Sequence, residues 1–103
     1  MDKFEVKDGE IYKPLAEILV NYGEGYLISN YGRIWSEKHR KYLSPFTTNG
    51  IMRIKLSCDK RLKSFSIASL VAKSFLPNPK NKVKVKFIDG NRHNVSVHNL
   101  VWE

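Results

Sequence analysis

The sequence predicts a small α+β domain made of antiparallel strands with one main helix. Its 103 residues are enough for one modest hydrophobic core. Residues 51–58 alternate apolar and polar side chains, which is typical of a strand with one buried face. Residues 67–75 instead repeat apolar side chains at helical spacing, which is typical of an amphipathic helix. The two patterns together favour a mixed fold.

The N-terminal half predicts short strands joined by tight turns. Residues 15–20 form an apolar run whose periodicity fits a helix or a strand. Two strands are predicted at residues 26–29 and 33–36. The turn between them is Asn30-Tyr31-Gly32, because Asn and Gly tolerate the positive φ that such connections need.

The middle of the chain predicts a strand pair followed by the helix. The strand at residues 51–58 leads through a turn at residues 59–61 into a second strand that ends near Phe65. Ser66 is placed to cap the first turn of the helix, and Pro77 is expected to end it. The predicted buried stripe of this helix consists of Ile67, Leu70, Val71, Ser74 and Phe75.

The C-terminal quarter predicts another half-buried strand after a loop. Residues 78–81 contain strong helix and strand breakers, and the strand is expected at residues 83–87. Residues 94–102 supply apolar anchors for a further short turn or strand. The outer face of the expected strand carries Lys82, Lys84 and Lys86.

Composition and the chain start limit the compartment and the partners. Residues 1–15 are polar and expected to be partly ordered at best, with a polar segment at 1–9 and one compact domain at 10–103. No apolar run reaches the length of a membrane span, so a membrane partner is not expected. The one cysteine, Cys58, cannot form an internal disulfide, which favours a reducing, cytoplasmic location.

Charge is distributed unevenly and points to a polyanion. Residues 1–30 hold three basic and six acidic side chains, whereas residues 31–103 hold fifteen basic and four acidic ones. A basic body attracts nucleic acid, although a solvated surface that keeps the chain soluble is the alternative. Trp35 is expected in the core rather than stacked on bases. The candidate binding residues, for nucleic acid or for an acidic partner, are Arg33, Lys38, Arg40, Lys41, Arg53, Lys55, Lys60, Arg61, Lys63, Lys82, Lys84 and Lys86.

Three stretches in the same order resemble one family. "GYLISNYGRIWS" (25–36), "SIASLVAKSFLPNPKNK" (66–82) and "FIDGNRHNVSVHNLVW" (87–102) are similar to successive motifs of phage and intron HNH homing endonucleases. The resemblance implies an SNxGR-type β module at residues 10–63. An HNH remnant, a ββα-metal-like hairpin, is implied at residues 64–103.

The family implies metal-dependent DNA cleavage, but this chain departs from it at the chemical positions. Phe87 stands at the general-base position and cannot accept a proton. Lys86 stands at the adjoining metal-ligand position, where a cation would repel a metal. The third ligand is expected on a helix after Trp102, and Ala68 and Ser69 replace the usual His-Arg pair. The resemblance therefore implies a degenerate HNH hairpin with no catalytic residue, no metal and no cofactor.

The rest of the HNH motif is interpreted as structural. Asp89, Gly90 and Asn91 have the side chains of a tight turn. Asn99 aligns with the middle Asn of HNH, which in the family ties the hairpin together. His93 and His98, with Asp89, are the only other candidate ligands, and their spacing fits no familiar metal site.

These observations predict a catalytically inactive, HNH-endonuclease-derived protein that binds double-stranded DNA. A phage or mobile element is the expected source, with the host cytoplasm as the location. One alternative is a phage protein that reuses the fold to bind and inhibit an acidic host protein. A second is a metal-dependent nicking endonuclease. A homodimer that covers the place of the absent helix is also possible.

Overall fold

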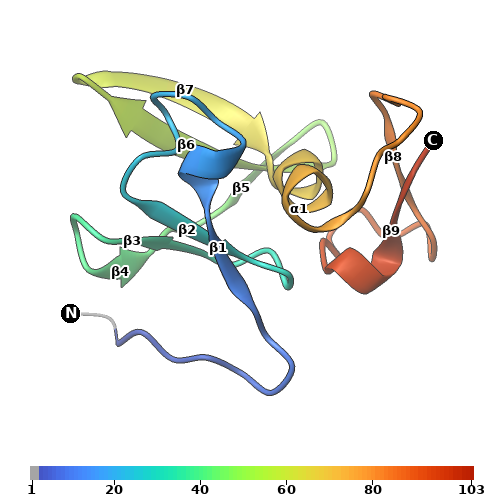
Figure 1. Cartoon of the computed structure of the whole chain (residues 1–103), viewed down its shortest axis with the longest axis horizontal. Helices are drawn as coiled ribbons and strands as arrows, with labels where there is room; N and C mark the ends of the chain where they lie inside the picture. The colour runs from blue at the N-terminus through green and yellow to red at the C-terminus, as the bar shows by residue number, and fades with distance from the viewer. Residues whose placement is uncertain (1–2) are drawn as a thin grey trace.

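Three small antiparallel sheets surround one α-helix in the computed structural model, which describes residues 3–103 (Figure 1). The first sheet has the order β1-β2-β3-β4, with strands Tyr12–Pro14, Tyr26–Ser29, Ile34–Ser36 and Lys41–Tyr42. The second sheet has the order β5-β6-β7, with strands Phe46–Thr48, Ile51–Cys58 and Arg61–Ser66. The C-terminal hairpin pairs β8 with β9, strands Val85–Phe87 and Leu100–Trp102.

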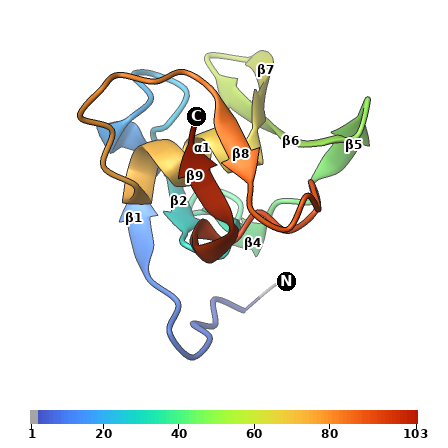
Figure 2. The same cartoon turned by 90° about the vertical axis from the view of Figure 1, so that its right-hand side faces the viewer.

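Helix α1, Ile67–Phe75, lies between the second sheet and the C-terminal hairpin (Figures 1 and 2). Two short 3-10 helices, η1 at Leu15–Glu17 and η2 at Val97–Asn99, precede β2 and β9. Within residues 3–103 no helix is long and apolar enough to span a bilayer. The mixed α+β architecture agrees with the class that the sequence patterns predict.

The core lies where the first two sheets and α1 meet. Its fully or almost fully buried side chains include Ile28 and Ile34 from the first sheet and Ile54 and Leu56 from β6. Leu15 of η1 is also fully buried. The apolar run at residues 15–20, whose periodicity fits a helix or a strand, thus begins as a 3-10 helical turn. The helix contributes Ile67, Ala68, Leu70, Val71 and Ala72.

The strongest local patterns give the elements that they predict. Strand β6 buries Ile54 and Leu56 and exposes Lys55, so its alternation of side chains places one face in the core. The hydroxyl of Ser66 accepts a hydrogen bond from Ser69 N at 3.4 Å, which caps the first turn of α1. The helix ends two residues before Pro77.

The strand expected at residues 83–87 is shorter than predicted. It begins at Val85, and Val83 is 86% exposed. Strand β9 offers Cα partners only to residues 85–87, so Lys82 and Lys84 do not lie on a strand face. Lys82 belongs instead to a loop closed by Asn78, whose amide bonds both the N–H and the C=O of Lys82, at 2.9 and 2.7 Å.

The N-terminal segment contacts the first sheet, although residues 3–9 themselves stay exposed. The Phe4 ring lies 4.8 Å from that of Tyr12 and 5.1 Å from that of Trp35, centre to centre. Glu10 is only 6% exposed. The boundary expected at residue 10 stays a prediction, and residues 1 and 2 lie outside the described residues.

Candidate nucleic-acid interface

The SNxGR motif joins separate parts of the molecule. Ser29 Oγ accepts hydrogen bonds from the backbone N–H groups of Tyr31 and Arg33, both at 3.1 Å, and so shapes the β2–β3 turn. Asn30 accepts from Ile11 N at 2.9 Å and donates to Gly9 O at 3.1 Å. The Asn30 carbonyl accepts from the backbone N–H at the start of η2 at 2.8 Å. These motif residues hold the fold together.

Gly32 allows the closest approach between the first sheet and the chain that leads to η2. Its φ is +86°, and a Cβ at this position would lie 2.5 Å from Val95 Cγ2. Only glycine combines that conformation with that contact. The turn can therefore pack directly against the C-terminal hairpin region.

Arg33, a predicted phosphate contact, is engaged in an internal ion pair. Its Nε and Nη2 donate to the two carboxylate oxygens of Glu10 at 2.9 and 2.6 Å, and its guanidinium lies 4.4 Å from the Tyr42 ring centre. Burial raises the pKa of Glu10, but hydrogen bonds from Arg33 and Lys7 N outweigh it and hold that pKa at about 2. The hydrogen bond with Glu10 raises the pKa of Arg33. We therefore leave Arg33 out of the interface.

The loop of the C-terminal hairpin is organised around one carboxylate. Asp89 Oδ1 accepts from Asn91 N at 2.7 Å and from Asn99 Nδ2 at 2.8 Å, and Asp89 Oδ2 accepts from Asn94 Nδ2 at 3.2 Å. Asn99 also accepts from Asp89 N at 3.0 Å and donates to Asn94 O at 3.0 Å. These bonds, first among them that from Asn91 N, lower the pKa of Asp89. Asn99 ties the two ends of the loop together, as the motif resemblance implies.

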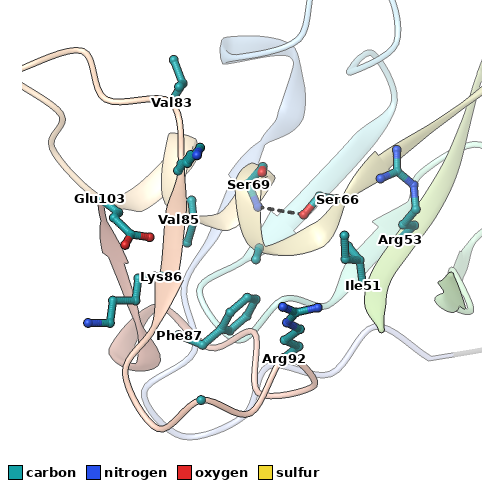
Figure 3. A pocket seen from close by; sticks show the side chains of 13 residues that line it. Ile51, Arg53, Ser66, Ser69, Val83, Val85, Lys86, Phe87, Arg92 and Glu103 are labelled. Carbon is teal, nitrogen blue, oxygen red and sulfur yellow. Dashed lines mark hydrogen bonds between the residues drawn. The ribbon is translucent and has the colours of Figure 1, made fainter. Parts of the chain in front are cut away.

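A cleft of about 580 Å³ lies between β8, the first turn of α1 and the edge of β6. Figure 3 shows the Phe87 ring pointing into it and the Lys86 side chain pointing away from that ring. Ala68 and Ser69 line the same cleft. The four resolved positions at which the sequence departs from the HNH pattern therefore meet at one place. The lining residues are Ile51, Arg53, Ser66, Ala68, Ser69, Val83, Lys84, Val85, Lys86, Phe87, Gly90, Arg92 and Glu103.

Basic side chains surround this cleft. Arg53 is oriented along β7, because its Nε and Nη2 donate to Ser64 Oγ and Ser64 O at 3.2 and 3.1 Å. Lys55 lies two residues further along β6, on the same outer face. Among the described residues that line the cleft, Glu103 is the one with a carboxylate side chain. We call Arg53, Lys55, Lys84, Lys86 and Arg92 the cleft-side cations.

Arg92 is the member of this set that the sequence analysis missed. It lies directly after the Asp89-Gly90-Asn91 turn, and that position is the one signal that could have suggested it. The Arg92 side chain reaches the β5–β6 turn, because a Cβ built on Gly50 in that turn would lie 3.5 Å from Arg92 Nη1. Arg92 thus closes one end of the cleft.

The other predicted cations lie elsewhere. Lys38 and Lys60 line a second hollow together with Glu24 and Asp59. Lys63 pairs across from buried Leu56, so it lies on the opposite face of the second sheet from Lys55. The remaining ones are Arg40, which is 3.7 Å from Glu37, Arg61, which pairs across from Cys58, Lys41 at the start of β4, and Lys82 in its loop.

Comparisons with known proteins identify the relatives. Residues of this chain are 37% identical over 78 residues to the uncharacterised HNH endonuclease L245 of Acanthamoeba polyphaga mimivirus, and 35% identical over 79 residues to L247 of the same virus. A solved structure described as DNA binding and cleavage by the HNH homing endonuclease I-HmuI has 29% identity and a TM-score of 0.77 over 90% of this chain. This chain is homologous to HNH endonucleases.

The HNH homology confirms the resemblance inferred from the motifs and the α+β fold class. The alignment with each mimivirus relative covers 75% of this chain, but only 24% of L245 and 20% of L247. The structural match covers 52% of the I-HmuI chain. No protein-family model matches the chain. The homology therefore describes a module, and the activity of the whole relatives is not carried over with it.

The residues at the HNH chemical positions do not fit a divalent metal. Lys86 carries a positive charge, and Phe87 has no lone pair to donate. The Asp89 carboxylate is occupied by the hairpin loop. His93 and His98 are exposed, and residues 3–103 contain no group of three His, Cys, Asp or Glu side chains placed to hold a metal ion.

Proposed function

We propose that this chain is a DNA-binding module derived from an HNH endonuclease, and that its cleft holds DNA without cutting it. The observation that carries the proposal is the cleft itself, in which Phe87 and Lys86 stand where the HNH chemistry needs a proton acceptor and a metal ligand. The cleft-side cations around Phe87 favour a phosphate as the ligand. A phage or mobile-element source and the host cytoplasm remain predictions.

The proposed contact surface runs from the cleft onto the outer face of the second sheet. Arg53 and Lys55 lie on β6, Lys84 lies directly before β8, Lys86 lies on β8 and Arg92 lies in the hairpin loop. Each phosphate that they neutralise on duplex DNA contributes about 0.9 to the slope of log K against log salt. Five such contacts would therefore make the affinity strongly dependent on salt.

Duplex binding with two charge-matched variants tests this surface. The first variant replaces Arg53, Lys55, Lys84, Lys86 and Arg92 by Gln. The control replaces an equal number of cations away from the cleft by Gln, namely Lys38, Lys41, Lys60, Arg61 and Lys63. Fluorescence anisotropy is measured at several salt concentrations, with EDTA and with Mg²⁺.

The first variant is expected to lose most of the salt slope and at least about tenfold in affinity, whereas the control retains most of both. Mg²⁺ is expected to act only as salt. Equal losses in both variants would contradict the assignment of the surface. Weak binding of the unaltered protein at low salt would overturn the DNA proposal and would direct attention to an acidic protein partner.

A plasmid assay tests the absence of cleavage. Supercoiled DNA incubated with the protein and Mg²⁺ or Mn²⁺ is expected to stay supercoiled. The comparison variant combines Asp89→Asn with His93→Ala, which removes the carboxylate and one imidazole of the motif, and circular dichroism establishes that it is folded. Nicking that the protein shows and the variant lacks would overturn the inactive assignment, because a contaminant would cut in both samples.

A further inference from the structure

The cleft beside Phe87 combines an apolar floor with a basic rim. We propose that it binds a single nucleotide, with the base stacked on the Phe87 ring and the phosphate held by the cations that line the rim. These rim cations are Arg53, Lys84, Lys86 and Arg92. This inference rests on the proposed DNA-binding function and names the ligand of the same site. A nucleotide that is unpaired within a DNA strand and a free mononucleotide share this chemistry, and the test below separates them.

Size and lining suit a base. The volume of about 580 Å³ lies within the range of small-molecule sites. The apolar side chains of Ile51, Ala68, Val85 and Phe87 face it from three elements. Phe87 is half-buried and its ring points into the cleft, where it offers apolar surface to a base (Figure 3). An imidazole would offer a proton acceptor here, whereas a phenyl ring offers only a surface.

The rim supplies charges that are held in place. Arg53 is fixed by two hydrogen bonds to Ser64, and Arg92 lies against the β5–β6 turn at Gly50. Lys84 and Lys86 border the cleft from the other side. With Glu103 as the single lining carboxylate among the described residues, the rim favours an anion such as a phosphate.

The position of the ring favours an unpaired nucleotide over a base pair. In a duplex, neighbouring bases cover both faces of each base, and only the edges reach a groove. A ring inside a cleft can stack on a base only after that base has left the duplex stack. Stacking on an aromatic side chain is worth about 1–3 kcal/mol per base, which offsets much of the cost of unstacking. Bulged or single-stranded DNA should therefore bind more tightly than perfect duplex.

The experiment uses a duplex with one bulged 2-aminopurine, the matching perfect duplex and free 2-aminopurine mononucleotide. The expected result is quenching of 2-aminopurine fluorescence on binding to the bulged DNA, with about tenfold tighter binding than perfect duplex. Phe87→Leu, which keeps an apolar side chain, should abolish the quenching and the preference. Phe87→Trp should retain both.

Phe75→Leu is the matched control, because Phe75 is also half-buried against the core but does not line the cleft. It should retain quenching and preference. Circular dichroism establishes that each variant is folded. If Phe87→Leu were unfolded, loss of quenching in Arg92→Gln at low salt, with retention in Lys38→Gln, would give the same support.

The outcomes separate this inference from the proposed function. Equal binding of bulged and perfect duplex without quenching would overturn the nucleotide site and leave the DNA-binding proposal standing. Quenching of the free mononucleotide that depends on Phe87, with no binding to either DNA, would support the site, assign it to free nucleotides and overturn the proposed function. Quenching that persists in both Phe87→Leu and Arg92→Gln would place the base elsewhere and overturn the inference.

Discussion

At the scale of single residues, the motif that signals the family serves the fold. Ser29 and Asn30 bind backbone groups of the turn, the N-terminal segment and η2, and Gly32 accommodates Val95. Arg33 was predicted to contact phosphate because it belongs to the SNxGR motif, which the family resemblance places near the sheet surface. Its partner Glu10 lies 23 positions earlier, and no local pattern indicates that ion pair.

Acidification is expected to weaken the fold through Glu10. Its pKa is about 2 in the folded protein, against 4.5 for an ordinary glutamate. A group whose pKa falls on folding stabilises the protein above its unfolded pKa, and that stabilisation is lost as the pH falls through the folded pKa. The free energy of unfolding should fall by about 3 kcal/mol more in the unaltered protein than in Glu10→Gln between about pH 5 and pH 2. Urea denaturation across this range measures the difference, and parallel pH profiles would contradict the prediction.

Replacing Gly32 by Ala should be more costly than replacing Gly25. Both have positive φ, +86° and +82°, but a Cβ at Gly25 meets nothing within 4 Å, whereas one at Gly32 collides with Val95. Gly25→Ala should cost about 1 kcal/mol through its backbone alone. Gly32→Ala should cost about 2–4 kcal/mol because overpacking is added. Thermal unfolding of the two variants gives the comparison, and equal losses would mean that Val95 moves away freely.

At the scale of elements, prediction succeeded where one segment carries its own pattern. Strand β6 has eight residues and α1 has nine, and each is long enough to show a clear period. Strands β4, β5, β8 and β9 have only two or three residues, so their partners define them. The overlong strand at residues 83–87 shows this limit, because the alternation continued past the end of the partner β9.

The candidate site could be predicted in its residue types but not in its assembly. Phe87 and Lys86 were found by motif comparison, because a motif fixes positions relative to one another. The cleft brings together β6, the first turn of α1 and β8, which only the tertiary fold places side by side. Arg92 was missed because a single basic residue in a loop carries no period. The cations of the β6–β7 turn were grouped with Lys55, although strand pairing turns Lys63 to the other face.

Asn99→Ala is expected to loosen the hairpin loop. The side chain makes three hydrogen bonds to residues 89 and 94, and it is buried. Its loss should cost about 2–3 kcal/mol and raise amide hydrogen exchange at residues 89–94. Asn78→Ala is the matched control, since Asn78 makes two hydrogen bonds in a solvent-exposed loop and should cost less than about 1.5 kcal/mol. Unchanged exchange in Asn99→Ala would show that the other bonds of Asp89 suffice.

At the scale of the whole molecule, the N-terminal segment covers part of one face of the first sheet. One face of this sheet packs into the core, and the segment covers the other, where Phe4 lies against Tyr12, Trp35 and Tyr42. Trp35 is only 2% exposed as a result, and it is buried as the sequence predicted. The contacts of Phe4 thus bring part of the acidic N-terminal third of the chain against the first sheet.

Phe4→Ala should expose Trp35. In a Trp102→Phe background, Trp35 is the only tryptophan, so its emission reports the cover directly. The emission maximum should move to longer wavelength and acrylamide quenching should rise, because water reaches the indole once the Phe4 ring is gone. Val6→Ala is the control, since Val6 is 57% exposed and should leave both readings unchanged. An unchanged spectrum in Phe4→Ala would mean that Tyr42 and Arg40 alone shield the indole.

The bonding of the hairpin loop has a consequence for evolution. Asp89 and Asn99 fix the shape of the loop through one another, and neither Lys86 nor Phe87 takes part in a side-chain hydrogen bond of that network. Changes at positions 86 and 87 therefore leave the hydrogen bonds of the loop in place, although the Phe87 ring also packs against the core. The residues that define the loop and the residues that line the cleft beside it are therefore largely separate sets, so the lining can vary in evolution while the loop keeps its shape.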